Sequence, residues 1–176
     1  MKVKIIRTIL IVLLLCTFGI IFGFSSQNST KSSGISGKIT IKITSNIKSI
    51  QEKNETEKAQ ILHKVEHIIR KIAHFSIYTV VGLLLMLLCK TYNIKELDRI
   101  AICLIIGIIY ATSDEIHQVF VPGRGPLFTD VLIDSMGVTV GMLIGKVSTK
   151  IYEKYVKYCQ VKGKMSQIFS NISTKK

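Results

Sequence analysis

The residues most able to carry chemistry in this sequence are ionisable side chains inside apolar stretches. A histidine and a tyrosine begin one stretch, an Asp-Glu pair ends the next, and two aspartates begin the last. The candidate catalytic residues are His74, Tyr78, Asp114, Glu115 and Asp130, and the candidate ligand-binding residues are Gln118, Arg124 and Asp134. A histidine titrates near neutral pH and can act as a general base or nucleophile. Carboxylates can orient it or bind a divalent cation, for which Asp114, Glu115 and Asp130 are the candidate ligands.

The spacing of these residues predicts which helix faces they occupy. Three pairs are four residues apart, so each pair stacks on one side of its helix: His74 and Tyr78, Asp114 and Gln118, Asp130 and Asp134. The face of the last pair continues as Gly137, Gly141 and Gly145. Small residues at this interval allow another helix to pack closely. We therefore expect Asp130 and Asp134 to point into a helical bundle, with Gly137 and Gly141 as packing residues.

The connection between the last two apolar stretches carries an arginine. Pro122 fixes φ and Gly123 tolerates a positive φ, so the pair predicts a tight turn. Such a turn would hold Arg124 over the cluster. Two roles stay open for this side chain: a salt bridge to Asp130 or Glu115, or a bidentate clamp for a phosphate or carboxylate.

The elements that must position these residues are four long apolar segments. The chain has 176 residues, is 48% hydrophobic and carries a formal net charge of +13, so its apolar residues and lysines must be separated into blocks. The apolar segments are Ile5–Phe24, Ile72–Cys89, Ile100–Val121 and Leu127–Val147. Each is about long enough to cross a hydrocarbon core of roughly 30 Å as a helix. A soluble bundle would have polar residues every three or four positions. The sequence therefore predicts an all-α integral membrane bundle of four transmembrane helices with additional interfacial amphipathic helices.

The flanking segments divide the chain further. Residues 1–24 are expected to form a retained N-terminal membrane helix (a signal anchor), since the apolar run is longer than a usual signal core. The alternative is a cleaved signal peptide, because Lys2, Lys4 and Arg7 precede the apolar run. Residues 25–60 are expected to form an external linker, flexible over Ser25–Lys42 because of its Ser, Thr, Gly and Lys content. Residues 61–147 would form the membrane domain, in which a helical pattern begins at about Ile61. Two arrangements stay open for its first part: an interfacial helix on the outer leaflet, or a helix that runs unbroken into the second span. Residues 148–176 would form a basic amphipathic tail on the anionic inner leaflet.

Lysines and arginines predict the orientation. They occur before the first span, between the second and third spans, and after the fourth span. The segment Ser25–Lys71 is also basic but would be external; at nearly fifty residues, and with four glutamates as partial compensation, it is a weak signal for orientation. Short basic segments stay in the cytoplasm. We expect a multi-pass protein of the bacterial plasma membrane with both termini cytoplasmic, and the ionisable cluster at the outer face.

Three ordered motifs in these segments resemble those of a known family. They read Arg70-Lys71-x-x-His74-Phe75-x-x-Tyr78, then Ser113-Asp114-Glu115-x-x-Gln118-x-Phe120-x-Pro122-Gly123-Arg124, then Asp130-Val131-x-x-Asp134-x-x-Gly137-x-x-x-Gly141. Over about Arg70 to Gly145 the sequence resembles the VanZ-like family. It departs from the family pattern at Asp134, where many members have Asn. The resemblance implies a small multi-pass bacterial membrane protein of the cell envelope, linked to teicoplanin resistance. More distantly, it is similar to helical membrane enzymes proposed to process lipid head groups.

Three functions are compatible with these residues. The first is an enzyme acting on a lipid or lipid-linked head group at the outer leaflet, in which Arg124 holds the phosphate. The second is a non-catalytic binder of lipid or of a glycopeptide. The third is a small transporter or proton relay, since carboxylate and histidine chains in membranes serve that purpose. Expected partners are membrane lipids, a lipid-linked cell-wall precursor or a glycopeptide, and no nucleic acid. No glycine-rich nucleotide loop is present, so a nucleotide cofactor is not expected. The cofactor is otherwise undetermined, and a divalent metal ion is the candidate because of the carboxylates.

Overall fold

The fold is built from helices alone. The computed structural model describes residues 2–26, 29–45, 47, 50, 54–122 and 128–173, with side chains placed in 2–26, 37–45, 47, 50, 54–122 and 128–162. The helices are α1 (Lys2–Ser25), α2 (Ser29–Thr44), α4 (Glu55–Lys90), α5 (Glu96–Val119) and α6 (Phe128–Ser173). No strand occurs in this described part of the chain. The predicted all-α class is confirmed.

Four of these helices have the length and hydropathy of membrane spans. They are α1, α4, α5 and the 128–162 portion of α6. Large apolar side chains remain on the outside of the bundle, among them Ile109, which is 64% exposed. In water such a surface would cause aggregation, whereas hydrocarbon solvates it. The prediction of four spans agrees with these lengths and compositions.

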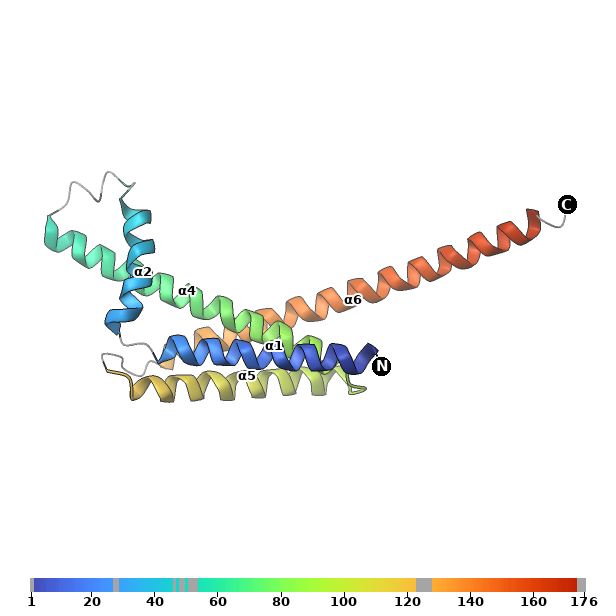
Figure 1. Cartoon of the computed structure of the whole chain (residues 1–176), viewed down its shortest axis with the longest axis horizontal. Helices are drawn as coiled ribbons and strands as arrows, with labels where there is room; N and C mark the ends of the chain where they lie inside the picture. The colour runs from blue at the N-terminus through green and yellow to red at the C-terminus, as the bar shows by residue number, and fades with distance from the viewer. Residues whose placement is uncertain are drawn as a thin grey trace.

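The four span-length helices lie side by side, with α4 in contact with every other described helix (Figure 1). The chain direction of α1 and α5 is opposite to that of α4 and α6 (Figure 1). The ends of α1 and α5 therefore meet the start of α6 and the middle of α4. This end of the bundle carries the histidine and aspartates singled out in the sequence.

The contact between α4 and α6 is the most extensive in the bundle and depends on glycine. A Cβ atom at Gly141 would overlap the carbonyl oxygen of Thr79, and one at Gly82 would overlap that of Val138. A Cβ at Gly137 would lie 2.6 Å from the carbonyl oxygen of Phe75. Because glycine has no side chain, the two backbones approach closely, and no larger residue fits at these positions.

The buried core follows this contact. The side chains of Tyr78, Val81 and Leu85 on α4 are almost completely buried, as is Val138 on α6. Cys103 on α5 belongs to the same cluster. The cysteine behaves as a small apolar group there, in line with its thiol being free.

The end of the bundle opposite to the aspartates is fastened by polar contacts. Arg7 Nη2 donates a hydrogen bond to the carbonyl of Thr91 at 2.7 Å, and its guanidinium lies 3.8 Å from the centroid of the Tyr92 ring. Lys146 Nζ lies 2.6 Å from Glu96 Oε1. These contacts join α1 to the α4–α5 connection and the start of α5 to the middle of α6.

The segment between the first two spans differs from the expectation. The stretch predicted to be a flexible linker contains the helix α2, which crosses the N-terminal half of α4 (Figure 1). Its Thr40 and Thr44 are buried, and the Thr44 hydroxyl donates to the Thr40 carbonyl at 2.7 Å. Packing against α4 therefore overrides the weak helix propensity of the Ser- and Gly-rich sequence.

The predicted interfacial helices are continuous with the spans. The helix expected from Ile61 is part of the unbroken α4, and the basic tail extends α6 without a break to Ser173. Tyr155 and Tyr158 of this tail are both 64% exposed and lie beyond the bundle.

Candidate functional site

Three side chains from three different helices converge at one end of the bundle. His74 comes from α4, Asp114 from α5 and Asp134 from α6. One potential ligand atom from each lies within 4.8 Å of the other two. His74 Nδ1 is 3.7 Å from Asp134 Oδ2. The two aspartates are buried, at 5% and 2% exposure, whereas the His74 side chain keeps 28% of its surface accessible. The cluster is thus an interior site that opens at the histidine.

The register between α4 and α6 brings Asp134 to His74. Gly137, one turn after Asp134, packs on Phe75 and Tyr78, which follow His74 on α4. Because the two helices run in the same direction, one turn back along both of them places Asp134 beside His74. The glycine contact therefore positions the site as well as stabilising the bundle.

A hydrogen-bonded glutamine orients the aspartate of α5. Gln118 Nε2 donates to Asp114 Oδ2 at 3.0 Å and to Ser25 Oγ at 3.2 Å. Gln118 and Ser25 are both buried. The amide thus links α5 to the end of α1 and supports the Asp114 carboxylate through one of its oxygens. Such supporting contacts hold catalytic or ligand groups in one geometry.

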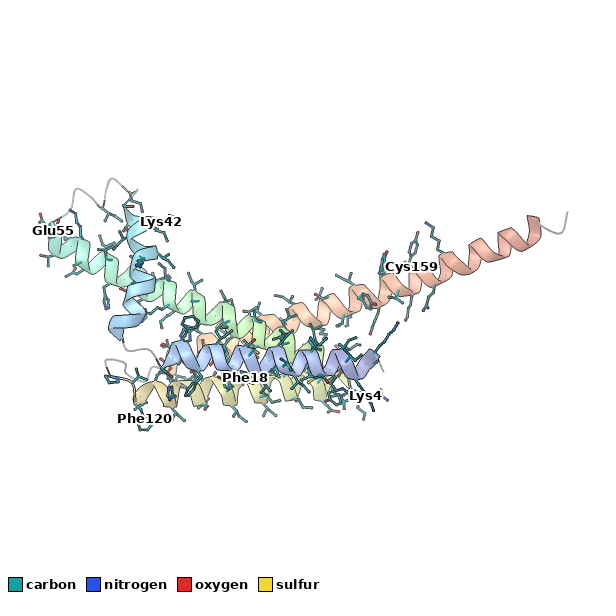
Figure 2. The ribbon with its side chains drawn as sticks, viewed as in Figure 1. Lys4, Phe18, Lys42, Glu55, Phe120 and Cys159 are labelled. Carbon is teal, nitrogen blue, oxygen red and sulfur yellow. The ribbon has the colours of Figure 1, made fainter. Side chains whose placement is uncertain are left out.

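Aromatic residues hold α1 beside the site. Phe18 of α1 stacks on Tyr110 of α5 with ring centroids 3.9 Å apart, at the contact between the two helices (Figure 2). The Tyr110 hydroxyl donates to the carbonyl of Phe18 at 2.7 Å. This contact keeps Ser25 within reach of Gln118.

Two buried polar atoms in the site have no hydrogen-bond partner among the described residues. They are the hydroxyl of Tyr78, whose side chain is fully buried, and Oδ1 of Asp134. Tyr78 lies one turn after His74, and the two ring centroids are 6.5 Å apart. An unsatisfied buried group costs about 1–3 kcal/mol. Proteins retain such groups where a ligand or ion completes them.

The electrostatics of the cluster are unfavourable without a compensating charge. Two ionised carboxylates whose oxygens lie within 4.8 Å of each other repel by at least about 3 kcal/mol at an effective dielectric constant near 20. Neutral His74 does not offset this repulsion, and protonated His74 offsets one charge only. The site therefore favours a cation or a shared proton.

The other sequence-predicted residues are placed differently. Asp130 lies one turn before Asp134 and pairs with Lys71, whose Nζ is 2.6 Å from Asp130 Oδ1. Glu115 is buried on α5 but is not one of the three clustered side chains. The proposed metal ligands Asp114, Glu115 and Asp130 thus differ from the observed cluster, which shares only Asp114 with them. Arg124 lies outside the described residues.

Sequence reasoning did not assign a role to Lys71 or Ser25. Lys71 stands in the first motif, three residues before His74, and its ammonium neutralises Asp130. The sequence marks Lys71 as part of the motif but does not show that its partner is Asp130 on another helix. Ser25 gave no such signal, because it reaches Gln118 only through the packing of α1 on α5.

Comparison with known proteins gives one match. A family model described as VanZ/LLP1 matches residues 10–149. The matched range covers most of α1, all of α4 and α5, and the part of α6 up to residue 149, and so includes His74, Asp114 and Asp134. No curated protein and no solved structure matches the chain.

Proposed function

Because the chain belongs to the VanZ/LLP1 family, we propose that it is an enzyme acting on phosphorylated lipid head groups at the outer leaflet of the bacterial plasma membrane. The family match and the four span-length helices make it a VanZ-like multi-pass membrane protein. The proposal adds the reaction class and the side of the membrane. It also includes a contribution to teicoplanin resistance, through a changed lipid or lipid-linked precursor.

One observation carries the proposal: His74, Asp114 and Asp134 converge from three helices at one end of the bundle. Lipid head groups lie at the ends of membrane spans, so substrate and cluster are at a similar depth. An imidazole beside buried carboxylates can move a proton or bind an ion during transfer at phosphorus. His74 is the exposed member of the three and is the first to meet a substrate.

The apolar surface around the site supports a lipid substrate. Phe120 follows the last residue of α5 and Phe128 begins α6, and they are 79% and 75% exposed. Phe120 projects away from the bundle at the end where the cluster lies (Figure 2). Aromatic rings at this depth contact acyl chains while the polar head reaches the cluster.

The function is tested with His74→Ala in a strain that lacks the chromosomal gene. The wild-type gene is expected to restore the original lipid profile and teicoplanin resistance, and His74→Ala to restore neither. Removal of a general base or ion ligand lowers turnover about 100-fold or more. The matched control is His63→Ala, an exposed histidine on the same helix, which should behave as wild type.

The outcome also separates catalysis from binding. If His74→Ala is inserted at normal levels and restores both the lipid profile and teicoplanin resistance, the enzyme proposal is wrong. If it restores resistance but the lipid profile never depends on the gene, the protein is a binder.

The outer location of the cluster is a separate prediction. In a variant without native cysteines, Pro122→Cys is expected to react with a membrane-impermeant maleimide in intact cells. Tyr92→Cys, at the opposite end of the bundle and 41% exposed, is expected to react only after permeabilisation. The reverse labelling pattern would place the cluster on the cytoplasmic side and exclude outer-leaflet lipids as substrates.

A further inference from the structure

We propose that His74 Nδ1 and the carboxylates of Asp114 and Asp134 bind one divalent transition-metal ion. This inference deepens the proposed function, on which its catalytic meaning rests, because it names the cation that would neutralise the carboxylates of the site. The binding of the ion itself is measured without any lipid.

The ligand set and spacing fit such an ion. Three protein ligands of mixed nitrogen and oxygen type, with one side open, are typical of catalytic zinc and related sites. Metal–ligand bonds of about 2.0–2.1 Å put tetrahedral ligand atoms about 3.3 Å apart. His74 Nδ1 and Asp134 Oδ2 are 3.7 Å apart, and the whole set lies within 4.8 Å. Small side-chain rotations would close the set around an ion.

Two unsatisfied polar atoms point independently to a ligand. Asp134 Oδ1 and the Tyr78 hydroxyl are both buried and lack a hydrogen-bond partner among the described residues. The Tyr78 hydroxyl also lies within electrostatic reach of Asp114 and Asp134. A metal-bound water would satisfy it, since water donates and accepts hydrogen bonds in such sites.

The charge of the ion matches that of the pocket. Two carboxylates and a neutral imidazole carry two negative charges, which a divalent ion neutralises in surroundings that solvate charge poorly. The neighbouring Asp130 is already paired with Lys71 and needs no share of this charge. Glu115, the other nearby carboxylate, is buried on α5.

A simple ion pair between His74 and Asp134 fits these observations less well. At 3.7 Å the two atoms are farther apart than in a good N–H···O hydrogen bond, which spans about 2.7–3.2 Å. A protonated His74 would also leave the charge of Asp114 uncompensated. The ion accounts for all three side chains and for both unsatisfied atoms.

The experiment is equilibrium dialysis of the purified full-length protein in detergent against Mn²⁺ or Zn²⁺ alone, with the metal content measured by mass spectrometry. One ion per chain is expected in the wild type. Asp114→Asn and His74→Phe are each expected to weaken binding at least 100-fold. The matched controls Asp130→Asn and His63→Ala should bind as the wild type does.

Three results would overturn the inference. The first is less than one ion per chain in the wild type with both metals. The second is binding that survives both Asp114→Asn and His74→Phe. The third is loss of the ion in Asp130→Asn, which would place it at the Lys71 pair instead. Size-exclusion profiles identify variants that do not fold. Even if both variants fail to fold, the wild-type stoichiometry shows whether the protein binds one ion per chain.

The ion and the reaction fail in different ways. If the wild type binds one ion but deleting the gene changes no lipid, the metal site stands and the proposed reaction is wrong. If no ion binds while His74→Ala still abolishes the lipid change, the reaction stands, and His74 acts through its proton.

Discussion

Gly141→Leu is expected to separate α4 from α6 and to lower the free energy of unfolding by more than about 4 kcal/mol. Even a single Cβ at this position overlaps the Thr79 carbonyl oxygen and lies 2.8 Å from the Leu83 nitrogen. These are backbone atoms, which cannot rotate away as a side chain does. The helices must therefore move apart, with loss of packing along their whole contact.

The measurement is unfolding in detergent micelles, followed by circular dichroism or by a thermal shift of a fluorescent reporter. Gly141→Ala should give a smaller loss in the same direction. The matched control is Gly19→Leu in α1, because a Cβ there meets nothing within 4 Å. Equal stability of Gly141→Leu and Gly19→Leu would show that the close α4–α6 contact does not exist in the protein.

The second large effect is expected from Asp114→Asn, which should abolish function while preserving or raising stability. The amide oxygen of Asn can still accept the hydrogen bond from Gln118, so the local fold is kept. Removing one of two buried carboxylates also relieves their mutual repulsion. We expect the metal-free protein to gain about 1–2 kcal/mol and the lipid-dependent phenotype to fall at least 100-fold.

Both quantities are measured on one variant, by unfolding of metal-free protein and by complementation of the deletion strain. Asp98→Asn is the control, since Asp98 is an exposed carboxylate in the first turn of the same helix. A drop in stability of more than about 2 kcal/mol in Asp114→Asn would contradict the interpretation. It would mean that the carboxylate serves the fold instead of a ligand.

The sequence predicts the framework of the site because helix periodicity is a local property. Residues three or four apart share a face, so the alignment of Asp134 with Gly137 and Gly141 follows from their numbers alone. The close packing at these glycines agrees with that pattern. The four apolar segments likewise follow from the length needed to cross a bilayer.

The composition of the cluster could not be derived in the same way. Asp130 and Asp134 share one face, and only the register between α4 and α6 decides which of them meets His74. That register depends on contacts between distant residues, such as Lys71 with Asp130 and Gly137 with Tyr78. A single sequence contains no direct record of such pairings. The contribution of Ser25 from α1 was hidden for the same reason.

The helix α2 could not be predicted either, because it depends on contacts with a distant segment. Its Ser- and Gly-rich sequence has little tendency to form a helix in isolation. Contact with α4 buries Thr40 and Thr44, and their hydroxyl and carbonyl groups are joined within the helix. Local composition predicted a linker because it does not report contacts made elsewhere in the chain.

Because α6 is unbroken, a small tilt at one end moves its other end by a larger distance. Its 46 residues form one rod about 69 Å long, with Asp134 near one end and Ser173 at the other. A tilt of about 5° at the glycine contact with α4, near Gly137, displaces Ser173 by roughly 5 Å, given the helical rise of 1.5 Å per residue. A tilt of α6 that hardly changes the position of Asp134 would therefore displace the C-terminal end of the helix by several times as much.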